Sequence, residues 1–403
     1  MDEASCISKL DLKRVNRSHI LRLIRDNGPL SRADIARMVR VTKSAVTILT
    51  GEMLEQGILW ERGEAVSRGG KLPRGRKKVL LDIDGSWRLA AGLVIGDGHL
   101  RIGVCSLTGG LVEQRSLPIP AGCSAEQLLS MARELYDDMA YKNNLKVGTA
   151  VGLGVCVAES CFPLLGITRD ERGQADYTAL QRAFSEFCSL PLAFGPAAVG
   201  VGTAETDYFP TPGQPAANLA VLCCGREPAC ALLVGGEPYP GLAAQPGALS
   251  ALSERYPSSP LGKACAAVSA AGIQNLCDRL YAGGECPSLM LAAENDPARF
   301  KEKFCEAGLD AADKAVQEAL LSLQQSYQLI LTHLACFYAA DRILCTGENL
   351  AASAAEKAAG KLNSEFQPVQ GGLIRLGHIF GGNFYLAGAA LATREFFINK
   401  GGL

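Results

Sequence analysis

The stretch from Ser31 to Gly57, SRADIARMVRVTKSAVTILTGEMLEQG, constrains the fold of this chain more than any other. Its apolar residues recur at helical spacing in two groups, Ile35–Val39 and Val46–Leu54, on either side of a short connection. Thr42 is a good N-cap for the second group, because its hydroxyl can accept a hydrogen bond from an amide of the first helical turn. Two short helices joined this tightly predict a helix-turn-helix.

The segments on both sides extend this motif. RSHILRLIRD at residues 17–26 has helical periodicity and ends in the turn residues Asn-Gly-Pro. Residues 58–61 and 78–83 are predicted to be strands that flank ERGEAVSRGGKLPRGRK, a tip rich in glycine and basic residues. Three helices followed by a basic hairpin are typical of a winged helix-turn-helix. A solvated loop whose charges only aid solubility is the alternative for the tip, and the adjacent helices favour the wing.

The second helix of such a motif lies in the DNA major groove, so its outward polar side chains can read bases and contact phosphates. Basic wing residues are expected to reach phosphates or a narrow minor groove. The predicted DNA-binding residues are Ser31, Arg32, Thr42, Lys43, Ser44, Thr47, Lys71, Arg74, Arg76, Lys77 and Lys78.

Charge is distributed unevenly along the 403 residues, although the formal net charge is only −1. Residues 1–80 hold 17 Lys and Arg against 9 Asp and Glu, a balance of +8, and the remainder holds 23 against 32, a balance of −9. A basic segment beside an acidic body is what a polyanion-binding module joined to another function looks like.

The longer part of the chain, after an Asp84-Gly85-Ser86 linker, is predicted to be an α/β fold. Strands are expected at 89–119 (a three-stranded meander), 147–158, 192–194, 219–234 (two strands) and 342–345. Helices are expected at 124–142, 177–188, 199–207, most of 258–339, 351–364 and 382–397.

Several classes of protein are disfavoured by the composition. The start, MDEASCISKLDLKR, has no signal-peptide pattern and no apolar run is long enough to span a bilayer, so we expect a cytoplasmic protein without membrane contact. The fifteen cysteines form no CxxC or CxC pair and lie mostly in apolar runs, which indicates reduced, buried side chains. The adjacent Cys223 and Cys224 could be redox-active, but the sequence offers them no activating neighbour.

Residues 14–84 resemble the N-terminus of transcriptional repressors of the ROK family (repressor, open reading frame, kinase). The similarity rests on NRSHILRLIRDNGPLSRADIARMVRVTKSAVTILTGEMLEQGIL, the Gly-rich basic wing and a strand that ends LLDID. Arg40 stands where the family usually has glycine in the connection, and Gly75-Arg76-Lys77 where it has GRP in the wing.

The resemblance implies an α/β fold in two parts: a winged helix-turn-helix at 1–84 and a two-lobed actin/hexokinase-like (ASKHA) domain at 85–403. The first lobe is expected at about 85–210 plus the C-terminal helix, and the second at about 211–384.

The body departs from the family's kinases at the residues that carry their chemistry. Ala197 occupies the position of the Asp that acts as base on the sugar hydroxyl, and residues 247–251 lack the family's sugar-binding Glu and His. The zinc motif retains only Cys265, and one cysteine cannot form a tetrahedral site. Gly96-Asp97-Gly98 and Cys224-Gly225-Arg226-Glu227 replace the phosphate-binding turns. We therefore expect no catalytic residue, metal or cofactor.

These patterns predict a sequence-specific DNA-binding transcriptional regulator, a repressor, whose dead kinase-like body dimerises and senses a small effector, carbohydrate-like or other. The expected partners are double-stranded DNA and further copies of the chain, in a dimer or higher oligomer. One alternative is an ATP-dependent sugar kinase with a DNA-binding appendage, against which Ala197 argues. The other is a pseudo-enzyme scaffold that binds proteins and only loosely binds DNA.

Overall fold

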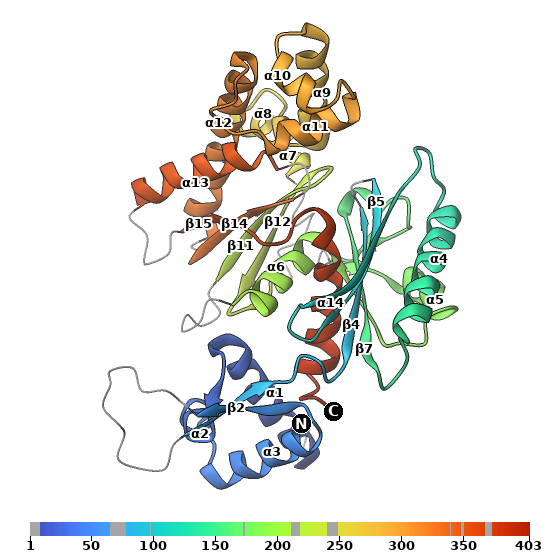
Figure 1. The fold of residues 1–403 in the computed structure, drawn as a ribbon, viewed down its shortest axis with the longest axis vertical. Coiled ribbons are helices and arrows are strands. Elements are labelled where there is room, and N and C mark those ends of the chain that lie inside the picture. Colours follow the sequence, from blue (N-terminus) through green and yellow to red (C-terminus); the bar gives the residue numbers. More distant parts are fainter. Residues whose placement is uncertain are drawn as a thin grey trace.

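The structure, a computed structural model, describes residues 9–64, 78–96, 98–171, 174–210, 218–239, 249–338, 340–347, 350–366 and 373–403. A small helical unit with a hairpin lies at one end of the molecule, and two lobes that each contain a sheet lie beyond it (Figure 1).

The N-terminal unit has the three predicted helices: α1 (Lys9–Asn27), α2 (Arg32–Val39) and α3 (Lys43–Glu55). Its strands are β1 (Leu30–Ser31), β2 (Leu59–Glu64) and β3 (Val79–Ile83), paired antiparallel in the order β1-β3-β2. The predicted winged helix-turn-helix is therefore confirmed, and β1 is an addition that the sequence did not predict. Residues 65–77, the tip of the wing, lie outside the described residues.

The first lobe contains a five-stranded sheet in the order β10-β7-β4-β5-β6. The strands are β4 (Leu89–Gly96), β5 (His99–Ser106), β6 (Leu111–Pro118), β7 (Ala150–Val157) and β10 (Leu192–Pro196). The meander β4-β5-β6 is antiparallel, as predicted, whereas β4, β7 and β10 are parallel. Helices α4 (Ala125–Asn143) and α5 (Thr178–Ser185) pack on one face, beside the short strands β8 (Thr168–Arg169) and β9 (Ala175–Asp176).

The second lobe contains another mixed sheet, in the order β13-β12-β11-β14-β15. The strands are β11 (Leu219–Cys224), β12 (Pro228–Val234), β13 (Glu237–Pro238), β14 (Arg342–Thr346) and β15 (Ile374–Leu376). Its helices are α7 (Ser250–Arg255), α8 (Pro260–Ala267), α9 (Ala270–Gly283), α10 (Pro287–Ala292), α11 (Pro297–Glu306), α12 (Lys314–Tyr338) and α13 (Ala352–Phe366). The predicted α/β character holds in both lobes.

Two helices lie between the sheets of the two lobes (Figure 1). Helix α6 (Ala197–Tyr208) packs on β11 and β12, and α14 (Tyr385–Thr393) packs on α6 and on the far face of the first sheet. A π-helical segment, Arg394–Ile398, continues α14 toward the winged unit. The C-terminal end of the chain therefore joins the first lobe to the N-terminal unit.

Glycines allow α14 to approach the first sheet at backbone distance. A Cβ placed on Gly154 of β7 would lie 1.9 Å from the carbonyl oxygen of Gly388, and one on Gly92 of β4 would lie 2.0 Å from that of Tyr385. The obstructing atoms belong to the backbone and cannot rotate away. The position of α14 therefore depends on glycine, which has no side chain, at these two positions.

The cysteines fit the prediction of reduced, buried side chains. Every cysteine in the described ranges is free, and most are buried. Burial raises the pKa of Cys105 to about 12, and it raises the pKa of Cys224 well above the ordinary value. Cys223 and Cys224 are both buried, so the structure gives no support to the redox alternative for this pair. Separately, none of the described helices is both long and apolar enough to cross a membrane.

Gly154→Ala is expected to lower the free energy of unfolding by about 3 kcal/mol, because the new methyl group collides with rigid backbone. Gly360→Ala in α13 is the matched control, since a Cβ there meets nothing within 4 Å. Alanine at this helical position should leave stability unchanged or raise it by up to about 1 kcal/mol. Urea unfolding followed by circular dichroism checks both values, and equal stability of the two variants would contradict the close packing of α14.

Candidate nucleic-acid interface

Local hydrogen bonds fix the two helices of the motif. The Ser31 hydroxyl accepts a hydrogen bond from the amide of Asp34 at 3.2 Å, which caps α2. The Thr42 hydroxyl accepts one from the amide of Ala45 at 3.3 Å, so the predicted N-cap of α3 is confirmed. Arg40, between the helices, has a left-handed backbone with φ of 60°. This conformation explains why glycine is favoured at such a connection.

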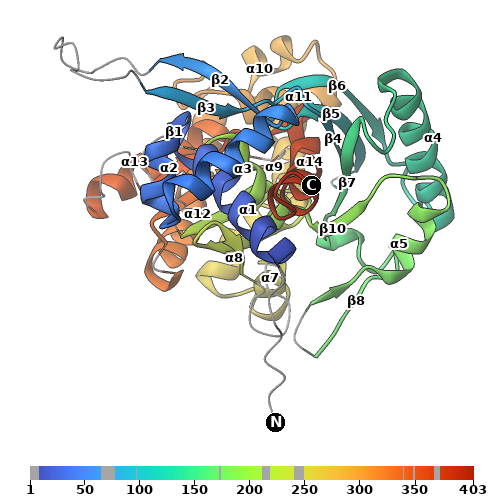
Figure 2. The same ribbon diagram turned by 90° about the horizontal axis from the view of Figure 1, so that it is seen from below.

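Helix α3 buries one face and exposes the other. Val46, Leu49 and Met53 lie in the core that the winged unit shares with the body, as the helical spacing predicted. The opposite face exposes Lys43, Ser44, Thr47 and Ile48. Figure 2 views the molecule from below and shows α1, α2 and α3 in front of the lobes, with the hairpin projecting to one side. An exposed polar helix face beside a hairpin has the shape that a major groove accepts.

The structure brings four of the predicted DNA-binding residues together at the start of α3. Thr42, Lys43, Ser44 and Thr47 are all exposed, and the Thr47 hydroxyl donates a hydrogen bond to the carbonyl of Lys43 at 2.8 Å. This bond leaves the hydroxyl oxygen with acceptor capacity toward a base donor. These four residues form one continuous surface.

The other described predictions lie away from this surface or are already engaged. Ser31 is only 3% exposed because it caps α2. Arg32 is half-buried and donates a hydrogen bond to the Thr50 hydroxyl at 3.2 Å. Lys78 is exposed and lies 3.3 Å from the Asp34 carboxylate. The remaining four residues, Lys71, Arg74, Arg76 and Lys77, fall within 65–77, outside the described part of the chain.

Asp34 of α2 places a negative charge beside Lys78, at the base of the hairpin. The hydrogen bond from Ser31, with Lys78 and Arg37 nearby, holds the pKa of the Asp34 carboxyl below its usual value although partial burial opposes this. The carboxylate therefore stays ionised at neutral pH. The carboxylate holds the Lys78 ammonium at the base of the wing by an ion pair.

Three exposed residues were missed by sequence reasoning. Ile48 is 63% exposed on the outer face of α3, and Arg37 and Arg40 are exposed at the end of α2. Ile48 could have been found, since it falls outside the apolar period that buries its neighbours Val46 and Leu49. An exposed aliphatic side chain on this helix is suited to contact the methyl group of thymine.

Arg40→Gly is expected to raise the free energy of unfolding by about 1 kcal/mol, because glycine adopts a positive φ without the steric penalty that a Cβ imposes. Arg40→Ala removes the same charged side chain but keeps the Cβ, so it should bring no such gain. Thermal unfolding of the two variants checks the prediction. A gain of equal size in both would trace the effect to charge instead.

A small cavity lies between the lobes beside the N-terminal end of α6. Its volume is about 30 Å³, and residues along its walls include Ala197, Ala198, Gly225, Glu227, Glu159 and Arg101. A cavity of this size holds about two water molecules and no hexose. An effector of sugar size would fit at this cavity only if its walls moved apart.

Three of the positions compared with kinase motifs, Gly96, Ala197 and Gly225, line this cavity. Ala197 lies at its wall, where a methyl group cannot accept a proton. The carboxylate of Glu159 lies 2.8 Å from Arg169, and burial raises its pKa although Arg169 opposes the shift. Cys265 is buried in the helical part of the second lobe. Among the described residues, no group of three or more His, Cys, Asp and Glu side chains could hold a metal ion.

Comparison with known sequences places similarity at the N-terminus. Residues 14–59 match a family described as winged helix-turn-helix DNA-binding. A putative xylose repressor of Caldicellulosiruptor sp. (strain Rt8B.4) is 30% identical over 118 residues, which cover 29% of this chain and 28% of that protein. The alignment thus spans less than a third of this relative's length.

Comparison with solved structures extends over the body. A ROK family transcriptional regulator, described as a homologue of the E. coli MLC protein, matches with a TM-score of 0.65 at 17% identity and covers 97% of each chain. A ROK family glucokinase from Streptomyces griseus matches with a TM-score of 0.55 at 14% identity, covering 75% of this chain and 98% of that one. The predicted resemblance to ROK-family regulators is confirmed in the N-terminal sequence and in the fold, a winged helix-turn-helix followed by a two-lobed domain.

Proposed function

We propose that this chain, which shares its fold and its N-terminal unit with ROK-family regulators, is a sequence-specific DNA-binding transcriptional repressor of the cytoplasm. The observation that carries the proposal is the exposed face of α3 with Lys43, Ser44 and Thr47, next to a hairpin that leads into a basic segment. The name of a relative supports repression, since a putative xylose repressor is 30% identical over 118 residues.

In this proposal the division of labour follows residues 1–84 and 85–403. The first part reads DNA, with α3 in the major groove and the wing on phosphates. The second part, with lobes of about 85–210 plus the C-terminal helix and about 211–384, pairs two chains and binds an effector between its lobes. Two α3 helices, one from each chain and about one helical turn of DNA apart, multiply affinity and specificity.

The proposal is tested by selecting duplexes from a random pool with the full chain and measuring their binding by gel shift at several salt concentrations. We expect enrichment of a near-palindromic sequence. The logarithm of affinity should fall with the logarithm of salt concentration by about 0.9 for each phosphate neutralised. Binding that is weak and indifferent to sequence would favour the protein-binding scaffold instead.

Lys43→Ala, Thr47→Ala and Ile48→Ala are each expected to weaken binding to the selected duplex by about 1–3 kcal/mol and to relax preference at one or two base pairs. Binding to unrelated DNA should change little for Thr47→Ala and Ile48→Ala, because neither residue carries charge. Repeating the selection with each variant measures the preference, with Lys361→Ala on α13 as a control far from the interface. A uniform loss across all sequences would mean that these side chains only position the helix.

The kinase-like body is proposed to transfer no phosphoryl group, because Ala197 supplies no carboxylate to accept the proton of a sugar hydroxyl. We expect the full chain to give no turnover above the protein-free blank in a coupled ATP assay with a panel of hexoses. A kinase of the same fold, run in parallel, shows that the assay works. Turnover that rises with the concentration of this chain would restore the kinase alternative.

A further inference from the structure

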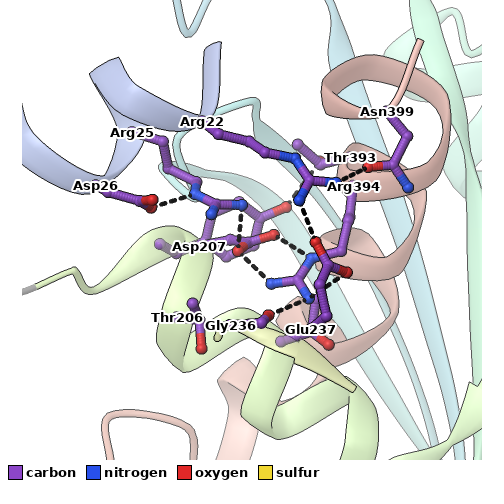
Figure 3. Close-up of polar contacts among 12 residues, drawn as sticks. Arg22, Arg25, Asp26, Thr206, Asp207, Gly236, Glu237, Thr393, Arg394 and Asn399 are labelled. Atoms are coloured by element: carbon purple, nitrogen blue, oxygen red, sulfur yellow. Dashed lines mark hydrogen bonds and ion pairs between the residues drawn. The ribbon is translucent and has the colours of Figure 1, made fainter. Parts of the chain in front are cut away.

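A cluster of charged side chains joins the winged unit to both lobes at the C-terminal end of α6 (Figure 3). At its centre is Asp207, whose side chain is only 2% exposed. Arg25 of α1 lies 2.8 Å from its carboxylate. Arg394, at the end of α14, donates from Nε at 3.0 Å to one carboxylate oxygen and from Nη2 to the other. One carboxylate thus holds guanidinium groups from two separate segments.

The surrounding contacts complete the cluster. Arg394 also donates to the carbonyl of Gly236 at 2.7 Å, on the turn before β13. Arg22 of α1 pairs with Glu237 and donates to the Asn399 side chain at 2.8 Å. Asp26 accepts a hydrogen bond from Arg25 at 2.7 Å. The cluster therefore contains three cations, Arg22, Arg25 and Arg394, and three anions, Asp26, Asp207 and Glu237, which balance.

Asp207 is ionised in this environment. Burial alone would raise its pKa, but Arg25 and Arg394 outweigh burial and hold the pKa below the usual value. The Arg394 contact is bidentate and therefore directional, and the same carboxylate also holds Arg25. Arg25 thus ties α1 to a carboxylate whose position Arg394 fixes.

The other end of α6 lies at the cavity between the lobes. Ala197 and Ala198, its first residues, line that cavity, about 15 Å along the helix axis from Asp207. Glu205, two residues before Asp207, accepts hydrogen bonds from the amides of His378 and Ile379 and holds the loop after β15. One rigid helix thus touches the cavity, the second lobe and the winged unit.

We propose that Asp207 is a positioning residue that fixes the DNA-binding unit to α6, so that movement of the lobes around the cavity moves α3. This inference rests on the proposed function, because it concerns how two α3 helices are spaced on DNA. Separation of the lobes by an effector would shift α6. Through Asp207 and Arg25 this shift would change the distance between the α3 helices of the two chains.

The test uses the full chain with Asp207→Asn and, as a milder variant that leaves the Asp207–Arg394 pair intact, Arg25→Gln. Asp137→Asn on α4 is the matched control, because Asp137 is exposed and its ion pair with Arg133 lies far from the cluster. The first readout is hydrogen exchange of the amides in residues 17–27. We expect exchange there to rise by about tenfold in both variants and to stay unchanged in the control.

The second readout is affinity for the selected duplex with base pairs inserted between its half-sites. The wild-type chain should lose affinity by about tenfold or more when the spacing changes, whereas both variants should vary by about threefold at most. Affinity for a single half-site should be similar in all four proteins, because no residue of α3 is altered.

Each outcome decides something. Unchanged exchange in residues 17–27 in both variants would overturn the proposal, as would raised exchange with the wild-type dependence on spacing, since the cluster would then be only a tether. If Asp207→Asn does not fold, Arg25→Gln carries the test alone. A wild-type chain that selects no duplex would defeat the proposed function, and the exchange measurement would still decide whether the cluster holds α1 in place.

Discussion

The C-terminal segment is the constraint on which the arrangement of the three parts depends. Phe397 and Ile398 share one continuous hydrophobic core with Ile20 and Ile58 of the winged unit and with α14. Arg17, which is fully buried, donates a hydrogen bond to the carbonyl of Gly401 at 2.8 Å. The last residues of the chain therefore complete the core of the first domain. A winged unit without them would expose apolar surface, and the Arg17 guanidinium would lose one acceptor and keep only those within the unit, such as Gln56.

Because of this packing, the winged unit is held against the body and is not joined to it by the linker alone. Trp87, just after the expected linker, packs on Phe397 with ring centroids 5.6 Å apart and donates to the carbonyl of Gln56 at 2.8 Å. Contacts across the junction are thus apolar near the linker and ionic near α6. Breaking one partner of a buried ion pair typically costs about 3–5 kcal/mol, whereas an exposed pair contributes about 0.2–1 kcal/mol. Removing one partner of the Asp207 cluster is therefore expected to cost more than removing one partner of any single exposed pair.

Much of the fold could be predicted from the sequence, because helices and strands that bury one face leave a periodic pattern. The helix-turn-helix, the meander and the central strands were found in this way. The short strands β1, β13 and β15 were not, since two or three residues carry no period and pair only because neighbouring segments present a free edge. Arg40 departs from the usual glycine in sequence, but only the backbone angle of 60° gives that departure a physical meaning.

Site residues that lie close together in the sequence could be predicted, and those that lie far apart could not. Thr42, Lys43, Ser44 and Thr47 lie on one turn and a half of a single helix, so spacing alone brings them together. The Asp207–Arg394 contact joins residues 187 positions apart, and no local pattern marks either residue as buried. A lone Asp near the end of an alanine-rich helix reads as a solvated residue until the fold brings two guanidinium groups to it. Residues that contact DNA can thus be predicted from the sequence of one helix. Residues that fix the position of that helix can be identified only from the tertiary structure.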